Sequence, residues 1–409
     1  MKPTLLVIGP TYTIAVNRQK LWALTTYFDV TCATSRSCDR VIFGHPIFES
    51  EEGETSEPIT VLRFREFPRK QRDTRMVYAG LDRALKSRSF DLVLVESEPW
   101  ALVKWQAWLL TRCFQRGARF GEFSWENVER TGWKGKLLAW IYRLSSRLDD
   151  FVICGNKNCR EIFLRQGARP DRALVAAQLG VDPEQFSPVE PAELKELRLR
   201  RGLPPDSYLV GFCGRFEPEK GVLDLVAAIQ SLRGAFPQLE LVLQGTGSLL
   251  PQLRGHNLPW MHILEAVPHF EVPDFLRSID VLVLPSKPFK SRQRVWEEQF
   301  GHVLIEAMAC GTLVLGSDSG SIPEVIGDPE AIFQNSNIDD LAQHLRAVFV
   351  DTALQRRLRE RQRQRVFDYF TNERVAARYA GFLLRLVNAR QTEGGGDQAS
   401  REDCEPPET

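Results

Sequence analysis

Short apolar runs alternate with longer helical patterns along almost the whole chain, and this alternation limits the possible folds most. A strand that recurs after each helix is typical of a parallel sheet covered by helices. Both halves show the pattern, so we predict an α/β protein of two doubly wound, Rossmann-like domains. The expected strands are Leu5–Ile8, Val30–Ala33, Ile59–Phe64, Leu92–Val95, Arg119–Phe123, Phe151–Cys154 and Leu174–Gln178, then Tyr208–Cys213, Leu239–Leu243, His262–Leu264, Val281–Leu284, Thr312–Leu315 and Ala331–Phe333.

A proline-rich stretch separates the two halves. It runs from Gly180 through Pro183 and Pro188 to Pro191, and neither a helix nor a central strand tolerates such a sequence. The length of 409 residues also suits two domains. We therefore expect an N-terminal domain over 1–182, a C-terminal domain over 183–366, a helix over 367–390 that packs back on the first domain, and a disordered acidic tail over 391–409.

The charges of the chain balance, with 53 basic and 53 acidic residues, so no overall field favours nucleic acid as a partner. Residues 63–88 are an exception, because nine basic side chains stand there against three acidic ones, a net of +6. The simpler interpretation of this patch is a solvated loop and helix face. The alternative is a surface that faces anionic lipid or a charged acceptor.

The cysteines and the N-terminus point to a cytoplasmic protein. Eight cysteines are scattered without a Cys-x-x-Cys pair, and Cys154 and Cys159 have no histidines at ligand spacing. This pattern favours reduced thiols and predicts no metal site. The apolar run Leu5–Ile8 is too short for a signal peptide, and nothing approaches the length of a spanning helix. Any membrane contact would be peripheral, at the inner face.

The first segment that indicates chemistry is Gly214–Gly221, which follows one predicted strand and precedes a helix. Loops at the carboxyl ends of parallel strands bind ligands in open α/β sheets. Arg215 offers a planar fork for phosphate oxygens and Lys220 a compact charge, a combination suited to a departing diphosphate. The alternative is that both cations pair with Glu217 and Glu219 on the surface.

The second segment is Trp296–Gly311. Its apolar part predicts a buried helix that Gly301 opens and Gly311 ends. The free N–H groups near His302 and Val303 suit phosphate oxygens. Glu306 would be a carboxylate on a mostly apolar helix, and it requires a partner: ribose hydroxyls, a neighbouring lysine or arginine, or an internal ion pair.

Together these segments resemble the retaining nucleotide-sugar glycosyltransferases of the GT-B, family 4 group. Glu298, Glu306 and Ala307–Gly311 match its Glu-x7-Glu and Ala-Met-Ala-x-Gly pattern, and the Gly-Arg-x4-Lys-Gly loop matches as well. The resemblance extends over about residues 140–390. Supporting matches are Gly180-Val181-Asp182 with Phe186-x-Pro188, Gly245-Thr246-Gly247, Pro285-Ser286 and Gly320–Val325.

The resemblance implies a GT-B fold, in which two domains face a central cleft, and a role for each motif residue. Arg215 and Lys220, beside Gly214, would hold the donor diphosphate, and Glu306 its ribose. Glu298, with the backbone of Phe300, Gly301, His302 and Val303, would hold the transferred sugar, which makes Glu298, Arg215 and Lys220 the catalytic candidates. Such enzymes need no cofactor and no metal beyond the nucleotide-diphosphate sugar itself, and their acceptor is a glycan or a lipid-linked molecule.

The first half departs from the family pattern. The loop after the first strand lacks paired glycines and leads to Asn17 and Arg18, and the stretch after the fifth strand offers Glu126 and Asn127 in place of a histidine. These four residues are the acceptor-side candidates. For Glu126 and Asn127, capping of the next helix is the alternative.

The tryptophans and the remaining histidines say less about function than the two motif segments do. Seven of nine tryptophans precede the linker, where aromatic faces suit sugars or a membrane interface, although core packing is the simpler interpretation for Trp105 and Trp108. His269 and the other histidines outside the motif show no companions that suggest catalysis. Two other functions remain open: a GT-B-shaped epimerase, hydrolase or phosphorylase, and a catalytically silent nucleotide-sugar-binding subunit.

Overall fold

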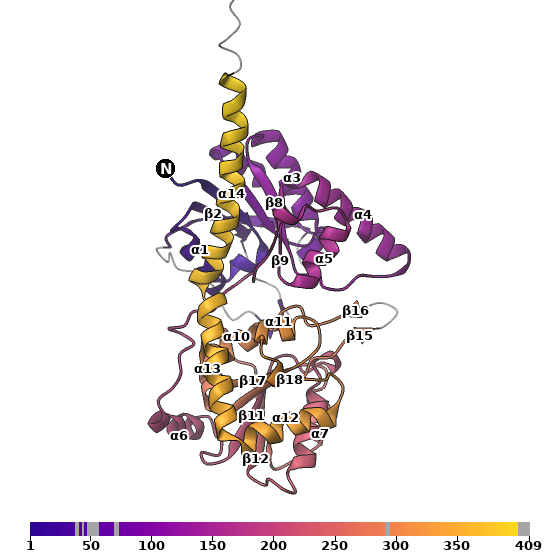
Figure 1. Cartoon of the computed structure of the whole chain (residues 1–409), viewed down its shortest axis with the longest axis vertical. Helices are drawn as coiled ribbons and strands as arrows, with labels where there is room; N and C mark the ends of the chain where they lie inside the picture. Colours follow the sequence, from indigo (N-terminus) through magenta and orange to yellow (C-terminus); the bar gives the residue numbers. More distant parts are fainter. Residues whose placement is uncertain (37–40, 43–44, 47–56, 69–72, 291–294, 400–409) are drawn as a thin grey trace, which may run out of the picture.

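The computed structural model describes residues 1–36, 41–42, 45–46, 57–68, 73–290 and 295–399. Within them the chain forms two α/β domains, one above the other in Figure 1, with the last two helices running along both. This arrangement agrees with the fold class predicted from the alternating pattern.

The N-terminal domain is built on an eight-stranded sheet in the order β10-β9-β8-β7-β1-β2-β5-β6. Every neighbouring pair is parallel except β5 and β6. The strands are β1 (Thr4–Ile8), β2 (Asp29–Ser35), β5 (Thr60–Phe67), β6 (Val77–Ala79), β7 (Leu92–Glu96), β8 (Arg119–Ser124), β9 (Phe151–Cys154) and β10 (Ala173–Val175). The helices are α1 (Gln19–Leu24), α2 (Leu81–Ser87), α3 (Leu102–Phe114), α4 (Gly132–Leu148) and α5 (Lys157–Arg165); β3 (Val41–Ile42) and β4 (His45–Pro46) form a separate pair.

The C-terminal domain has a six-stranded, fully parallel sheet in the order β13-β12-β11-β14-β17-β18. Counted along the chain this is the order 3-2-1-4-5-6 of a Rossmann fold. The strands are β11 (Tyr208–Cys213), β12 (Leu239–Gln244), β13 (Met261–Leu264), β14 (Val281–Leu284), β17 (Leu313–Ser317) and β18 (Ile332–Phe333). The helices are α6 (Pro191–Arg200), α7 (Val222–Leu232), α8 (Leu250–Gly255), α9 (Val272–Ser278), α10 (His302–Ala309), α11 (Ile322–Ile326), α12 (Ile338–Val350) and α13 (Thr352–Tyr369).

The chain crosses between the domains at two neighbouring places. Val181 N–H donates to the Phe370 carbonyl over 2.8 Å, and Asn372 N–H donates to the Val181 carbonyl over 3.2 Å. After the second crossing, α14 (Asn372–Ala399) packs on α1 of the N-terminal domain. Phe382 of α14 also lies 6.0 Å from Phe151 of β9, measured between ring centroids. The predicted linker therefore forms one of two adjacent connections.

Three features differ from the sequence-based prediction. The antiparallel edge strand β6 and the hairpin of β15 (Phe289–Lys290) with β16 (Val295–Trp296) were not expected, because both are too short for a visible period. Helix α14 continues to Ala399, into the segment predicted to be disordered from 391, since glycine weakens a helix without forbidding it. Residues 400–409 lie outside the described part.

The basic stretch 63–88 is divided between β5, β6 and α2, and its residues 69–72 lie outside the described part. Two of its cations have local partners: Lys86 pairs with Asp82 and Arg88 with Asp29. Across the described residues, the helices are all too short or too polar to cross a bilayer.

Candidate donor site at the domain interface

The loop after β11 occupies the point where the strand order of the C-terminal sheet reverses, the usual ligand-binding place in such sheets. Its backbone is fixed by close packing: a Cβ on Gly221 would lie 1.9 Å from the Pro285 carbonyl oxygen, and one on Gly245 would lie 2.0 Å from that of Gly214. Gly221 also has a left-handed φ of 68°. Only glycine fits at these two contacts.

Arg215 is the cation that this loop leaves available. It is half-buried, and no other described residue forms a hydrogen bond or ion pair with its guanidinium. Glu217 accepts hydrogen bonds from Ser248 instead, at 3.1 Å to the backbone nitrogen and 2.6 Å to Oγ. The surface pairing of Arg215 with Glu217, weighed above as the alternative, is therefore absent among these residues.

Lys220 joins the two motifs directly. Its Nζ lies 2.6 Å from Glu298 Oε2, which also accepts a hydrogen bond of 2.7 Å from Ser286 Oγ. The same ammonium group lies 4.6 Å from the centre of the Trp296 ring. Glu298 is 6% exposed, so this pair is largely shielded from water. The structure thus pairs Lys220 with the second motif rather than with Glu217 or Glu219.

The backbone of Glu298 is held by two other segments. Its carbonyl accepts from Ser321 N–H and from Asn127 Nδ2, each at 2.9 Å. A Cβ on Gly320 would lie 2.1 Å from the same carbonyl oxygen, and Gly320 has a φ of 56°. The Gly320–Val325 match therefore has a physical reason, because the turn must approach the loop 297–301, which we name the donor loop, without a side chain.

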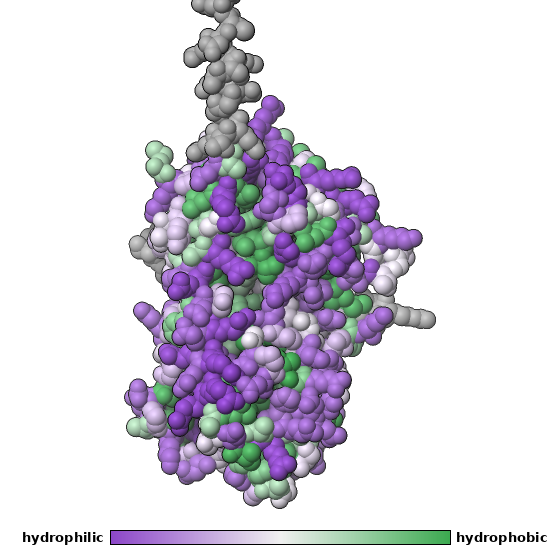
Figure 2. All heavy atoms as spheres, in the orientation of Figure 1, coloured by the Kyte–Doolittle hydropathy of each residue, from purple (hydrophilic) through white to green (hydrophobic). Residues whose placement is uncertain are grey.

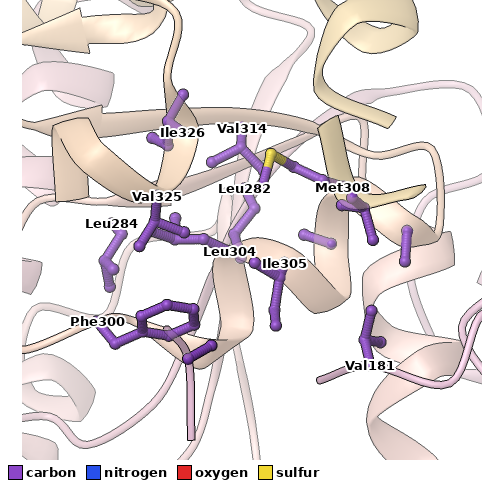
Figure 3. Close-up of a cluster of buried hydrophobic side chains, with 14 of the residues drawn as sticks. Val181, Leu282, Leu284, Phe300, Leu304, Ile305, Met308, Val314, Val325 and Ile326 are labelled. Carbon is purple, nitrogen blue, oxygen red and sulfur yellow. The ribbon is translucent and has the colours of Figure 1, made fainter. Parts of the chain in front are cut away.

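Gly301 opens α10 with φ 76° and ψ 65°, as expected from the sequence. The N–H groups of His302 and Val303, in the first turn, have no carbonyl four residues before them within the helix, so they face outward as potential anion ligands. The apolar side chains of α10, among them Leu304, Ile305 and Met308, pack against β14, β17 and α11 (Figure 3). This buried packing fixes the direction of the helix.

Glu306 finds its partner in a histidine. His269 Nε2 lies 2.8 Å from Glu306 Oε1, and His302 Nε2 lies 3.9 Å from the same oxygen. Burial by itself would raise the pKa of Glu306, but the charge and hydrogen bond of His269, with a contribution from His302, hold that pKa below its usual value. The prediction that His269 has no companions is wrong, since this histidine reaches Glu306 from a short 3-10 helix, His269–Glu271, that shows no sequence motif.

The N-terminal domain contacts three consecutive residues of the donor loop. Besides the Asn127 bond to Glu298, Asn156 Nδ2 donates to the Gln299 carbonyl over 3.2 Å, and the Trp125 and Phe300 rings lie 5.5 Å apart. Glu126 lies next to Asn127 but pairs with Arg130 at 3.2 Å. Thr131 is the N-cap of α4, so the helix-capping alternative for Glu126 and Asn127 is wrong.

The other two acceptor-side candidates support the fold. Asn17 Nδ2 donates to the Thr11 carbonyl over 2.9 Å. Arg18 is fully buried, donates to the Tyr12 carbonyl over 2.7 Å and forms an ion pair of 2.7 Å with Glu57. In this structure their side chains are used internally, so neither is presented to an acceptor.

A buried polar cluster at the carboxyl end of β7 was missed by sequence reasoning. Glu96 accepts hydrogen bonds from Tyr12 at 2.6 Å, from Lys20 at 2.5 Å and from Gln178 at 2.9 Å. Gln178 in turn accepts from Trp125 Nε1 at 2.9 Å, which connects this cluster to the donor loop. These residues come from four separate segments, so no spacing in the sequence joins them. Among the described residues, no three His, Cys, Asp or Glu side chains gather as they would around a metal ion.

Two Rossmann-like domains that meet at the carboxyl ends of their strands define the GT-B class of protein, and solved structures agree with this fold. The chain superposes on sucrose-phosphate synthase from Thermosynechococcus elongatus with a TM-score of 0.70 at 20% identity, over 94% of this chain and 100% of the other. Anabaena HepE in complex with UDP gives a TM-score of 0.69 at 16% identity, over 93% and 100%.

The sequence comparison relates the C-terminal domain to one family. Residues 195–365 match the family model of glycosyl transferases group 1. An α-maltose-1-phosphate synthase from Mycolicibacterium smegmatis is 29% identical over 214 residues, which are 49% of this chain and 52% of the relative. The chain thus spans about half the length of the curated relatives it matches.

Proposed function

We propose that the protein is a retaining glycosyltransferase that uses a nucleoside-diphosphate sugar as donor. The observation that carries the proposal is the joint position of Arg215, Lys220 and the start of α10 at the point where the C-terminal sheet reverses its strand order. A diphosphate placed there would meet two cations and two free N–H groups. The structural neighbour HepE was solved in complex with UDP, which supports a nucleotide as part of the donor.

For the reaction we propose the one that the resemblance to retaining family 4 enzymes implies. The bond between the anomeric carbon and the diphosphate oxygen breaks, and a bond from the acceptor oxygen to that carbon forms on the same face of the sugar. The acceptor's hydroxyl proton passes to the departing phosphate, so no protein nucleophile is required. Arg215 and Lys220 stabilise the charge that grows on the leaving group, and Lys220 exchanges its contact with Glu298 for one with the diphosphate.

The two motif glutamates bind different parts of the donor in this proposal. Glu306, which His269 holds, would accept hydrogen bonds from ribose hydroxyls, while Glu298, three residues before Gly301, would contact the transferred sugar. The acceptor is a glycan or a lipid-linked molecule that enters from the N-terminal domain. We assign the reaction to the cytoplasmic side, without a metal ion, in polysaccharide or glycolipid synthesis.

A thermal-shift screen against nucleotide sugars tests the donor. A ligand at 100 times its dissociation constant stabilises the folded state by about 2.7 kcal/mol, which such a screen detects easily. Product analysis then separates the alternatives: transfer to an acceptor supports the proposal, whereas an epimer or free sugar formed at the full turnover rate contradicts it. Binding without turnover across a broad acceptor panel would assign the chain as a silent subunit.

A further inference from the structure

Helix α4 carries its large apolar side chains on the outside. Trp133, Leu137 and Trp140 are 72%, 50% and 58% exposed. Spaced four and three residues apart, they share one side of the helix. An exposed strip of this kind on a folded domain marks a surface that contacts something else. We name it the α4 strip, and α4 lies at the outer edge of the N-terminal domain (Figure 1).

The other side of α4 is anchored, so the strip cannot turn inward. Tyr142 packs against Phe163 at 4.9 Å between ring centroids, and Ser145 Oγ accepts a hydrogen bond of 2.7 Å from the buried Lys104. Gly135 touches the preceding loop so closely that a Cβ would lie 1.8 Å from the Arg130 carbonyl oxygen. These contacts set the rotation of the helix about its axis.

The charges of α4 are all positive. Its sequence holds Lys134, Lys136, Arg143 and Arg147 and no acidic residue. At about 100° per residue, Lys136, Arg143 and Arg147 border the strip on one side and Lys134 on the other. Tryptophan at the centre with cations at the borders is the arrangement that suits a bilayer surface, where indole rings lie at headgroup depth and cations meet lipid phosphates.

We propose that the α4 strip docks the protein on an anionic lipid bilayer, with Trp133 and Trp140 inserted among the headgroups. A second copy of the chain fits less well. A twofold dimer through this surface would place the same cations against each other without an acidic partner.

If positive charge were the only criterion for a membrane-binding surface, the arginine-rich face of α13 would be chosen instead of α4. The face of α13 is strongly hydrophilic in Figure 2 and rich in arginine. Two of its arginines, Arg357 and Arg361, are neutralised by Glu330, with Asp328 also beside Arg361. Among the described residues of α13, Tyr369 at its end is the sole exposed large apolar side chain. The α4 strip combines both properties, and the two surfaces make different predictions.

The location of the strip bears on the acceptor, a point that rests on the proposed function. Trp133 is six residues from Asn127, which touches the donor loop, so at most about 22 Å separate their Cα atoms. A bilayer held at α4 would therefore lie beside the domain interface, which favours a lipid-linked acceptor over a free glycan. Membrane binding itself needs no sugar transfer and is tested separately.

The test is co-sedimentation of the full chain with vesicles of phosphatidylcholine alone or mixed with phosphatidylglycerol. We expect binding to the anionic vesicles, reduced about tenfold or more by Trp133→Gln with Trp140→Gln, since losing 1.4 kcal/mol is a factor of ten. Lys136→Glu with Arg143→Glu should remove the preference for phosphatidylglycerol. Leu199→Gln, which changes an equally exposed apolar residue on α6, and Arg356→Glu on α13 are the matched controls and should bind as the unaltered protein does.

Two further measurements distinguish membrane binding from misfolding of a variant and from formation of a dimer. Hydrogen exchange of the unaltered protein should slow in α4 when anionic vesicles are added, which needs no variant to fold; slowing in α13 instead, or no binding at all, would overturn the proposal. Light scattering gives the oligomeric state, and a dimer that the two tryptophan substitutions convert to monomer would assign the strip to a second copy.

Discussion

Arg215 differs from the other cations near the donor loop because it has no partner among the described residues. Replacing it should therefore leave the folded state almost unchanged. We expect Arg215→Ala to lower kcat about 100-fold or more, the usual loss when a preorganised contact to developing charge is removed. Arg254→Ala, an exposed arginine on α8, is the control. An unchanged kcat with an intact fold would remove Arg215 from the reaction.

Substitutions of the two motif glutamates, Glu298 and Glu306, should have different kinetic effects. If Glu306 holds the ribose, it contacts a part of the donor that does not change during reaction, so Glu306→Gln should weaken binding of the bare nucleoside diphosphate and raise the donor KM. His269→Ala should do the same, because it removes the partner of Glu306. Glu298→Gln should mainly lower kcat. Calorimetry with nucleotide alone decides, and equal losses of affinity for both glutamates would contradict this division.

Glu98 gives the clearest pH effect on stability. Burial, with repulsion from Glu126, raises its pKa to about 7, although hydrogen bonds from Ser124 and the Trp125 backbone oppose the rise. A carboxyl whose pKa is higher in the folded state destabilises that state as pH increases from about 4.5 to 7. Glu98→Gln should therefore gain stability over the unaltered protein, by roughly 1 to 3 kcal/mol at pH 8 and little at pH 5.

Thermal unfolding across this pH range measures the difference directly. Glu129→Gln, which replaces a half-exposed carboxylate paired with Arg165, is the comparison variant. A constant gap between the Glu98 variant and the unaltered protein at all pH values would mean that the carboxyl does not titrate in this range.

At the scale of elements, the segment after β8 and the donor loop form a unit that spans both domains. The Asn127 side chain contributes one neutral hydrogen bond, worth about 0.5 to 1.5 kcal/mol. If this bond positions Glu298, Asn127→Ala should lower kcat roughly 2- to 10-fold while the affinity for bare nucleotide stays the same. Asn158→Ala, on the exposed side of α5, is the control. Equal loss of nucleotide affinity would show a general loosening instead.

Elements were also the scale at which sequence reasoning succeeded most. Strands β9, β11 and β14 have the predicted bounds, because each is an uninterrupted apolar run buried on both faces. Gly214, Gly301 and Glu306 are site candidates from local motifs, each of which lies within a single turn or helix. Lys20, His269 and Gln178 were not, since each acquires its partner only when distant segments meet. A contact between two segments far apart in the sequence cannot be predicted from the hydrophobic periodicity of either segment.

At the scale of the whole molecule, the charge on the diphosphate should be met by side chains rather than by a divalent ion. We expect transferase activity to survive chelation by EDTA, because Arg215 and Lys220 supply the two positive charges that a metal would otherwise bring. The assay is transfer rate before and after chelation. Complete loss of turnover that magnesium or manganese restores would contradict the prediction.

The two adjacent chain crossings also determine how the domains can move. Connections side by side act as one pivot, so the domains can rotate about it but cannot slide apart. Phe300 lies beside this pivot, 5.8 Å from Phe370 between ring centroids. When the domains rotate, residues close to the pivot move only a short distance, whereas residues at the far edges of the domains move further. The donor loop would thus stay assembled when the molecule opens, so we expect the nucleotide sugar to bind first and the acceptor second.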